Sequence, residues 1–182
     1  VNGGGIRADI EAGNVTYEDI INVHPYGNEM CLAVATGQEI LDALELSVMN
    51  APLEDGGFQH VSGLTYTIDL SVPSSVVLDA TGSFAGVAGP YRGTNVFVNG
   101  QPLDVNSTYT VASHNYMIKE GGSGFNMFMD NTLLQDCTML DNQLLIDYIT
   151  GYLGGTIGNQ YADPYGSGRI QYIGVQATAN AA

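Results

Sequence analysis

Hydrophobic residues recur along the chain with two periods, and these periods indicate where helices and strands form. In residues 37–50 the apolar side chains recur every three or four positions, at Ile40, Leu41, Leu44 and Val48. That spacing predicts an amphipathic helix. The preceding residues 29–36 are dense in apolar side chains and predict a buried strand, against which this helix packs.

Residues 141–155 carry the second clear helical pattern. Its apolar stripe comprises Leu144, Leu145, Tyr148, Ile149, Tyr152 and Leu153. Asp141 is placed to act as the N-cap, and Gly154 and Gly155 close the segment. The sequence therefore predicts two main amphipathic helices.

Shorter signals divide the rest of the chain. Thr16 with Asp19 three residues later resembles a helix start, and Pro25 ends that segment. Asn99 and Gly100 between apolar runs predict a tight hairpin. Residues 72–90 are rich in small residues and proline, and they predict a long loop or a weak hairpin.

Strands and helices alternate without a regular strand–helix–strand rhythm. Further strands are predicted over residues 60–70, 107–118 (ending near His114), 133–140 and 168–175, with a short helix from Gly124. This mixture favours the α+β class, as a layered α/β domain with mixed sheets. We expect one domain over residues 1–172, followed by a polar tail or linker over 173–182.

Composition and charge narrow the possible functions. The chain has 182 residues, 45% of them hydrophobic, which is typical of a globular domain. Because it begins abruptly in a loop, we expect it to be a piece of a larger protein. Nineteen acidic against four basic residues give a net charge of −15, which disfavours duplex nucleic acid and anionic membranes as partners. A small anionic ligand would need a local device such as an arginine, backbone N–H groups or a metal.

The two cysteines leave two interpretations open. Cys31 and Cys137 fit no metal-binding or redox spacing. They form either a disulfide that closes a long loop or two buried thiols in separate strands.

Two glycine-rich turns are the first candidates for ligand contact. They read "NGGGIR" (residues 2–7) and "EGGSGF" (residues 120–125), and glycines allow backbone N–H groups to approach a ligand closely. By pattern alone each is more often a simple tight turn. Arg7 is either an anion clamp or a structural partner of Asp9 or Glu11, and Arg92 and Arg169 share that ambiguity.

Two tyrosines lie near these turns. Tyr26 is in the loop "HPYGN", and Tyr116 lies just before the second glycine turn. Both could stack on a flat ring, or each could cap the core with its hydroxyl in water. No nucleophile motif is present, and adjacent carboxylates such as Glu54 and Asp55 are expected in any acidic chain. The sequence thus predicts binding residues without a complete catalytic centre.

In combination these motifs resemble a known family. The C-terminal domain of the 5'-nucleotidase family, which includes UDP-sugar hydrolases and 2',3'-cyclic phosphodiesterases, is similar in four stretches: "NGGGIR", "HPYGN" with its tyrosine nineteen residues after the arginine, "ASHNYMIKEGGSGF" and a closing "GRI". The resemblance covers about residues 1–172. It implies that an N-terminal metallophosphoesterase domain, absent from this chain, holds two divalent metal ions and catalyses hydrolysis, while this chain holds the substrate and no cofactor.

The resemblance also implies roles for individual residues. Arg7 would grip the substrate phosphate, Asn2 would hydrogen-bond the nucleoside, and Tyr26 and Tyr116 would sandwich the base. The loop with Gly121 and Gly122 departs from the family, since Ser123 stands where an aspartate usually holds the ribose hydroxyls. Ribose recognition should be weaker, which leaves cyclic nucleotides, deoxynucleotides, nucleotide sugars or another phosphate ester open as substrates.

We therefore expect the substrate-recognition domain of an extracellular, periplasmic or cell-surface nucleotide phosphohydrolase, inactive by itself. Two alternatives remain open. One is a non-catalytic surface-adhesion module derived from such a domain. The other is a free-standing nucleotide or small-molecule binder.

Overall fold

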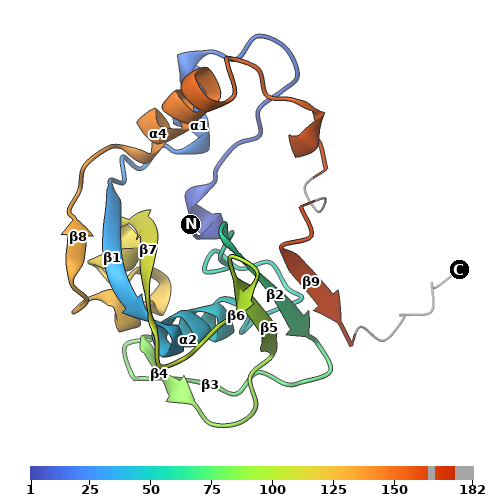
Figure 1. Cartoon of the computed structure of the whole chain (residues 1–182), viewed down its shortest axis with the longest axis vertical. Coiled ribbons are helices and arrows are strands. Elements are labelled where there is room, and N and C mark those ends of the chain that lie inside the picture. The colour runs from blue at the N-terminus through green and yellow to red at the C-terminus, as the bar shows by residue number, and fades with distance from the viewer. Residues whose placement is uncertain (164–166, 175–182) are drawn as a thin grey trace, which may run out of the picture.

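The computed structural model describes residues 1–163 and 167–174, and two sheets form its framework (Figure 1). In the three-stranded sheet, β1 (Met30–Thr36) lies between β7 (Thr108–His114) and β8 (Leu133–Gln135), antiparallel to both. The four-stranded sheet has the order β6-β5-β2-β9, with β6 at Gln101–Pro102, β5 at Gly93–Val98, β2 at Leu64–Asp69 and β9 at Ile170–Ile173. Strand β9 runs parallel to β2, whereas β5 is antiparallel to it.

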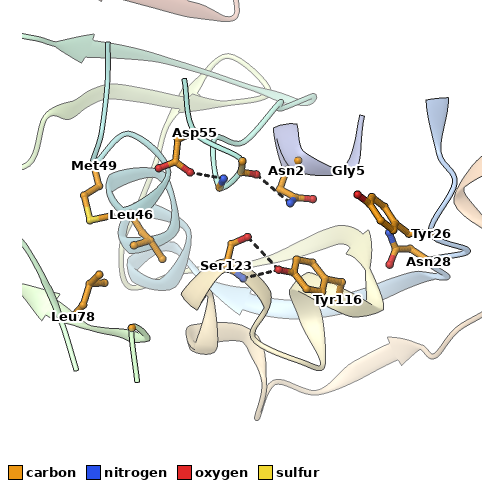
Figure 2. Close-up of a pocket in the computed structure, with 14 residues that line it drawn as sticks. Asn2, Gly5, Tyr26, Asn28, Leu46, Met49, Asp55, Leu78, Tyr116 and Ser123 are labelled. Atoms are coloured by element: carbon orange, nitrogen blue, oxygen red, sulfur yellow. Dashed lines mark hydrogen bonds between the residues drawn. The ribbon is translucent and has the colours of Figure 1, made fainter. Parts of the chain in front are cut away.

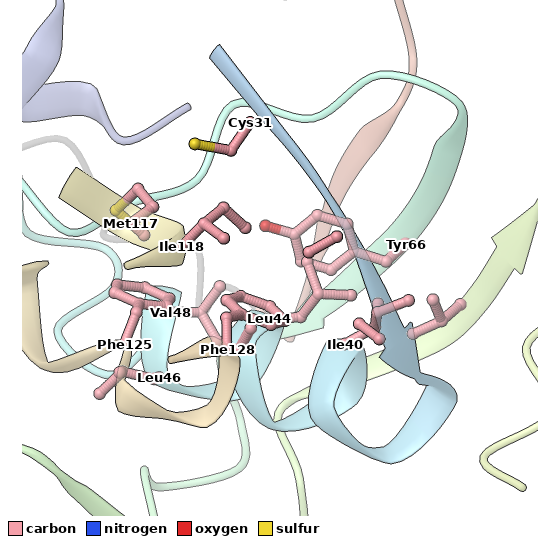
Figure 3. Packing of buried hydrophobic residues seen from close by; sticks show 14 of the residues in the cluster. Cys31, Ile40, Leu44, Leu46, Val48, Tyr66, Met117, Ile118, Phe125 and Phe128 are labelled. Atoms are coloured by element: carbon pink, nitrogen blue, oxygen red, sulfur yellow. The ribbon is translucent and has the colours of Figure 1, made fainter. Parts of the chain in front are cut away.

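Helix α2 (Gly37–Ser47) contacts both sheets. Thr36 caps it in a capping box, since the Thr36 hydroxyl accepts from Glu39 N at 3.2 Å and the Glu39 carboxylate accepts from Thr36 N at 2.7 Å. The hydrophobic core lies around this helix (Figure 3). Its buried side chains include Leu44, Tyr66, Ile68, Met117, Ile118, Phe125 and Phe128.

A second group of helices packs away from this core. Helix α1 (Tyr17–Val23) contacts α4 (Asp141–Asp147), and a π-helical turn over Tyr148–Tyr152 follows α4 (Figure 1). The remaining elements are the hairpin β3 (Val76–Leu78) and β4 (Phe84–Val87), α3 (Asn115–Ile118), and 3-10 turns at Gly3–Gly5, Gly122–Gly124, Asn126–Phe128 and Asn159–Tyr161.

The predicted fold class, α+β, is confirmed, and so are most elements. Thr16 caps α1 through a capping box with Asp19. The hairpin turn at Asn99 and Gly100 joins β5 to β6, with φ of 49° and 78° at these two residues. Residues 72–90 contain the β3–β4 hairpin.

Three expectations about residues 133–155 were wrong. Strand β8 ends at Gln135, because the chain turns at Cys137, where φ is 47°. The N-cap of α4 is Leu140, and Asp141 is its first residue. The tyrosines of the expected apolar stripe face outward, since Tyr152 is 78% exposed and stacks on Tyr148 at 4.9 Å between ring centroids.

The boundaries of the expected domain, residues 1 and 172, and the tail that follows it remain predictions. The tail expected over residues 173–182 lies outside the described residues, apart from Ile173 at the end of β9 and Gly174. In the described part of the chain, no helix combines the length and apolarity that crossing a bilayer requires.

Candidate ligand-binding site

A cavity of about 660 Å³ opens where four loops meet the β3–β4 hairpin, which contributes Leu78 and Gly82 (Figure 2). The N-terminal turn contributes Asn2, Gly4 and Gly5, and the loop before β1 contributes Tyr26 and Asn28. The turn after α2 contributes Asp55, Gly56 and Gly57, and the segment after β7 contributes Tyr116 and Ser123. Segments far apart in sequence therefore form one concave surface, as small-molecule sites generally do.

The N-terminal turn is fixed by hydrogen bonds to the turn after α2. Gly3 N donates to Phe58 O at 2.7 Å and Gly4 N donates to Gly56 O at 2.9 Å. The buried Asn2 side chain donates from Nδ2 to Gly56 O at 3.1 Å. An added Cβ on Gly4 would lie 3.2 Å from Gly56 O, so this close approach favours glycine.

The Tyr116 ring rests on the second glycine turn. Its hydroxyl accepts a hydrogen bond from Ser123 N at 3.1 Å and lies 3.3 Å from Ser123 Oγ. A Cβ on Gly122 would lie 2.3 Å from the Tyr116 ring, so ring and backbone are in direct contact. Gly121 and Gly122 do not line the cavity themselves. Gly122 supports the Tyr116 ring, whereas an added Cβ on Gly121 would meet Met129 and Asn126.

Tyr26 forms the more exposed border of the same cavity. Its side chain is 61% exposed, and Figure 2 shows it and Tyr116 bordering the cavity with Asn28 beside Tyr26. The loop is anchored just beyond it, because Asn115 Oδ1 accepts from Glu29 N at 2.8 Å and Asn28 O accepts from Asp141 N at 2.9 Å. Two aromatic faces are thus available to one ligand.

Arg7 does not line this cavity. Its side chain is exposed, and its backbone N donates to Val23 O at 3.0 Å. No ion pair joins it to Asp9 or Glu11, both of which lie within the described residues. The structure thus brings together Asn2, Tyr26, Tyr116 and Ser123, and leaves the guanidinium of Arg7 at the surface.

Sequence reasoning missed Asp55, Asn28 and Met49 as lining residues. The Asp55 carboxylate accepts from Gly57 N at 2.6 Å and from Asn50 Nδ2, which fixes its orientation. One sequence feature could have indicated Asp55: the stretch Asp55-Gly56-Gly57 is a third glycine-rich turn, and it carries an acidic residue. Nothing in the sequence alone places that turn beside Ser123.

His114 lies buried behind the cavity wall. Its Nε2 is 3.2 Å from Asn2 Oδ1, and its Nδ1 has no partner among the described residues. Because burial disfavours the charged ring, the pKa of His114 lies below its ordinary value, although Asp141 opposes this. The neutral ring therefore donates from Nε2 and holds the Asn2 amide in place.

We expect the free energy of unfolding to fall as the pH drops below about 6.5. In that range the unfolded chain binds a proton at His114 and the folded chain resists doing so, whereas above it both forms are neutral. Urea unfolding at about pH 7.5 and 5.5 measures the effect. His114→Gln keeps a donor for Asn2 and should lose part of the dependence. The remainder comes from His60 and from the α-amino group of Val1, whose pKa values are also lowered by burial. An unchanged dependence in that variant would contradict the assignment.

Within the described part of the chain, no group of possible metal ligands lies at the cavity. Among the described residues, the group of three that could share an ion is Cys31, Asp136 and Cys137, and none of them lines the cavity. The arrangement can enclose a flat, polar molecule, and it offers hydrogen-bonding and aromatic surfaces to it.

Fold and cavity together define a mixed α/β domain with a ligand pocket bordered by two tyrosines and a glycine-rich turn. The family model described as "5'-nucleotidase, C-terminal domain" matches residues 1–130. The chain belongs to this family.

Relatives and solved structures agree with this. The chain is 31% identical over 94% of its length to the trifunctional nucleotide phosphoesterase protein YfkN of Bacillus subtilis, covering 11% of that protein. It is 28% identical over 94% of its length to a 5'-nucleotidase of Vibrio parahaemolyticus, covering 26% of it. A 5'-nucleotidase precursor from Thermus thermophilus superimposes with a TM-score of 0.76 at 31% identity, over 96% of this chain and 31% of that one. The chain thus spans about a quarter or less of the curated relatives named here.

Proposed function

We propose that this chain is the substrate-recognition domain of a two-domain, metal-dependent nucleotide phosphohydrolase. The observation that carries the proposal is that Asn2, Tyr26, Tyr116 and Ser123 line one cavity in a chain of the 5'-nucleotidase C-terminal family. An N-terminal metallophosphoesterase domain would hold two divalent metal ions and supply the water that attacks phosphorus. The residues of this chain would bind and orient the substrate.

The base would stack on Tyr26 and Tyr116. Every base has a π-face, so stacking gives affinity with little sequence preference, at ~1–3 kcal/mol per base. The amide of Asn28, beside Tyr26, offers both donors and an acceptor to the edge of a base. In support of this, both rings border the same cavity.

The sugar would lie between Ser123 and Asp55. The Ser123 hydroxyl is a weaker acceptor than a carboxylate, but the Asp55 carboxylate borders the same cavity and keeps lone pairs beyond its bonds to Gly57 and Asn50. A ribose diol could therefore donate to Asp55. The phosphate would point outward to the exposed Arg7, toward the metal-bearing domain.

The parent protein would act outside the cytoplasm, in the periplasm, at the cell surface or in the medium. Support comes from the word precursor in the name of the Thermus thermophilus relative. Its partners would be a nucleotide or related phosphate ester and its own N-terminal domain. The net charge of −15 argues against duplex nucleic acid.

Calorimetric titration of the isolated chain tests the proposal. We expect weak binding of AMP and adenosine, none of inorganic phosphate, and no hydrolysis of AMP with divalent metal added. Tyr116→Ala should lower the affinity for AMP and for adenosine by about 5- to 100-fold, because one stacking face is lost. Arg7→Ala should weaken the binding of AMP and leave the affinity for adenosine unchanged.

Tyr152→Ala is the matched control, since Tyr152 is exposed and its ring stacks on Tyr148 outside the cavity. It should bind like the wild type. Equal affinities for the wild type and Tyr116→Ala would refute the site. Metal-dependent turnover of AMP by the isolated chain would refute the division of roles between the domains.

A further inference from the structure

The two cysteines meet although 106 residues separate them. Cys31 is fully buried in β1, and Cys137 lies half-buried in the segment between β8 and α4. Their sulfur atoms are 3.8 Å apart, and both residues are free thiols. Figure 3 shows Cys31 among the buried hydrophobic residues.

Paired backbone holds the two thiols at this separation. Met30 N donates to Met139 O at 2.8 Å, and Thr138 N donates to Met30 O at 3.1 Å. An isolated bridge between Glu29 and Leu140 extends this pairing. The contact between the sulfur atoms is therefore a property of two hydrogen-bonded segments and not of two mobile side chains.

Lys119 and Asp136 complete the surroundings of the pair. Lys119 Nζ lies 2.6 Å from Asp136 Oδ1 and 3.6 Å from Cys137 Sγ. The three groups that could chelate a soft cation, Cys31, Asp136 and Cys137, thus have an ammonium beside them already. That cation neutralises the carboxylate a metal would need, so the arrangement favours sulfur–sulfur chemistry over metal binding.

We propose that Cys31 and Cys137 are a site of oxidative modification, at which a thiol–disulfide oxidant joins them as a disulfide. The more exposed Cys137 loses its proton to solvent and attacks one sulfur of the oxidant, which forms a mixed disulfide and releases one oxidant thiolate. Cys31 then loses its proton and attacks the Cys137 sulfur, which releases the second oxidant thiolate. Two cysteine thiols are oxidised, and one oxidant disulfide is reduced to two thiols.

The cross-link would join segments that carry the cavity. Asn28, next to Tyr26 in the cavity wall, precedes β1 and accepts from Asp141 N at the end of the Cys137 segment. Lys119, which contacts Cys137, precedes the turn that supports Tyr116. A disulfide here would hold the Tyr26 loop against the body of the domain.

Incubation with mixtures of oxidised and reduced glutathione tests the proposal. We expect both thiols to disappear together, with a mass decrease of about 2 Da, and a monomer on a non-reducing gel. The thermal midpoint should rise by about 5–15 °C, and dithiothreitol should reverse it. Since the pKa of Cys137 is raised to about 12 by Asp136 and burial, the reaction at neutral pH should be slow.

Cys31→Ser and Cys137→Ser are the matched controls. Neither should show the loss of 2 Da or the oxidant-dependent rise in midpoint, and Cys31→Ser should instead accumulate the mixed disulfide between Cys137 and glutathione, seen as a mass gain. The proposal is overturned by two titratable thiols in the most oxidising mixture, by covalent dimers in place of an internal bond, or by thiol protection that appears only with added zinc. None of these readouts involves nucleotide binding, so they stand apart from the proposed function.

Discussion

Gly122→Ala is expected to weaken nucleotide binding by about 10- to 100-fold while the chain remains folded. An added Cβ would lie 2.3 Å from Cε1 and Cζ of Tyr116, which is inside van der Waals contact. Gly122 does not have a left-handed φ, so its backbone accepts alanine and the ring must move. Displacing one stacking face costs ~1–3 kcal/mol of binding free energy.

Titration of AMP and adenosine into Gly122→Ala, with circular dichroism to confirm folding, measures this effect. Gly151→Ala is the matched control, because its added Cβ meets no described atom within 4 Å beyond its chain neighbours and its own helical backbone. The double variant with Tyr116→Ala should bind no more weakly than Tyr116→Ala alone, because both changes remove the same contact. Wild-type affinity in Gly122→Ala would show that the Tyr116 ring does not touch the ligand.

Local sequence signals predicted those parts of the fold that local interactions determine. The capping pair of Thr16 and Asp19 and the turn at Asn99 and Gly100 each satisfy their hydrogen bonds or φ angles within a few residues. The stripe assigned to residues 141–155 failed for a physical reason. A π-helical turn at Tyr148–Tyr152 changes the residues per turn, so a period of 3.6 no longer describes which side chains face inward.

The sequence predicted only those cavity residues that belong to a recognisable motif. Tyr26 and Tyr116 came from such motifs and both border the cavity. Asp55 was not predictable, because its place depends on how the turn after α2 packs against the N-terminal glycines. The sequence also could not tell apart Arg7 and Arg92, which the structure places at the surface and in the interior.

Arg92 is a structural residue of the turn that follows α2. Its Nη1 donates to Val48 O at 3.0 Å and to Met49 O at 3.3 Å, and its Nη2 donates to Ala51 O at 3.0 Å. The buried Glu45 carboxylate accepts from Arg92 N at 2.7 Å. The guanidinium therefore donates hydrogen bonds to carbonyls at the end of α2, close to Met49 in the cavity wall.

Arg92→Met should lower the free energy of unfolding by about 3–5 kcal/mol, because it leaves the Glu45 carboxylate buried without its neighbouring cation and removes the donor to the carbonyls of Met49 and Ala51. Val48 O loses one donor and keeps its bond from Ala51 N. Urea unfolding at neutral pH measures the change. Arg7→Met, at an exposed arginine, should change stability by less than about 0.5 kcal/mol and serves as the control. If both variants unfolded at the wild-type midpoint, the carbonyl contacts of Arg92 would contribute nothing to the turn, and the wall of the cavity near Met49 would need another support.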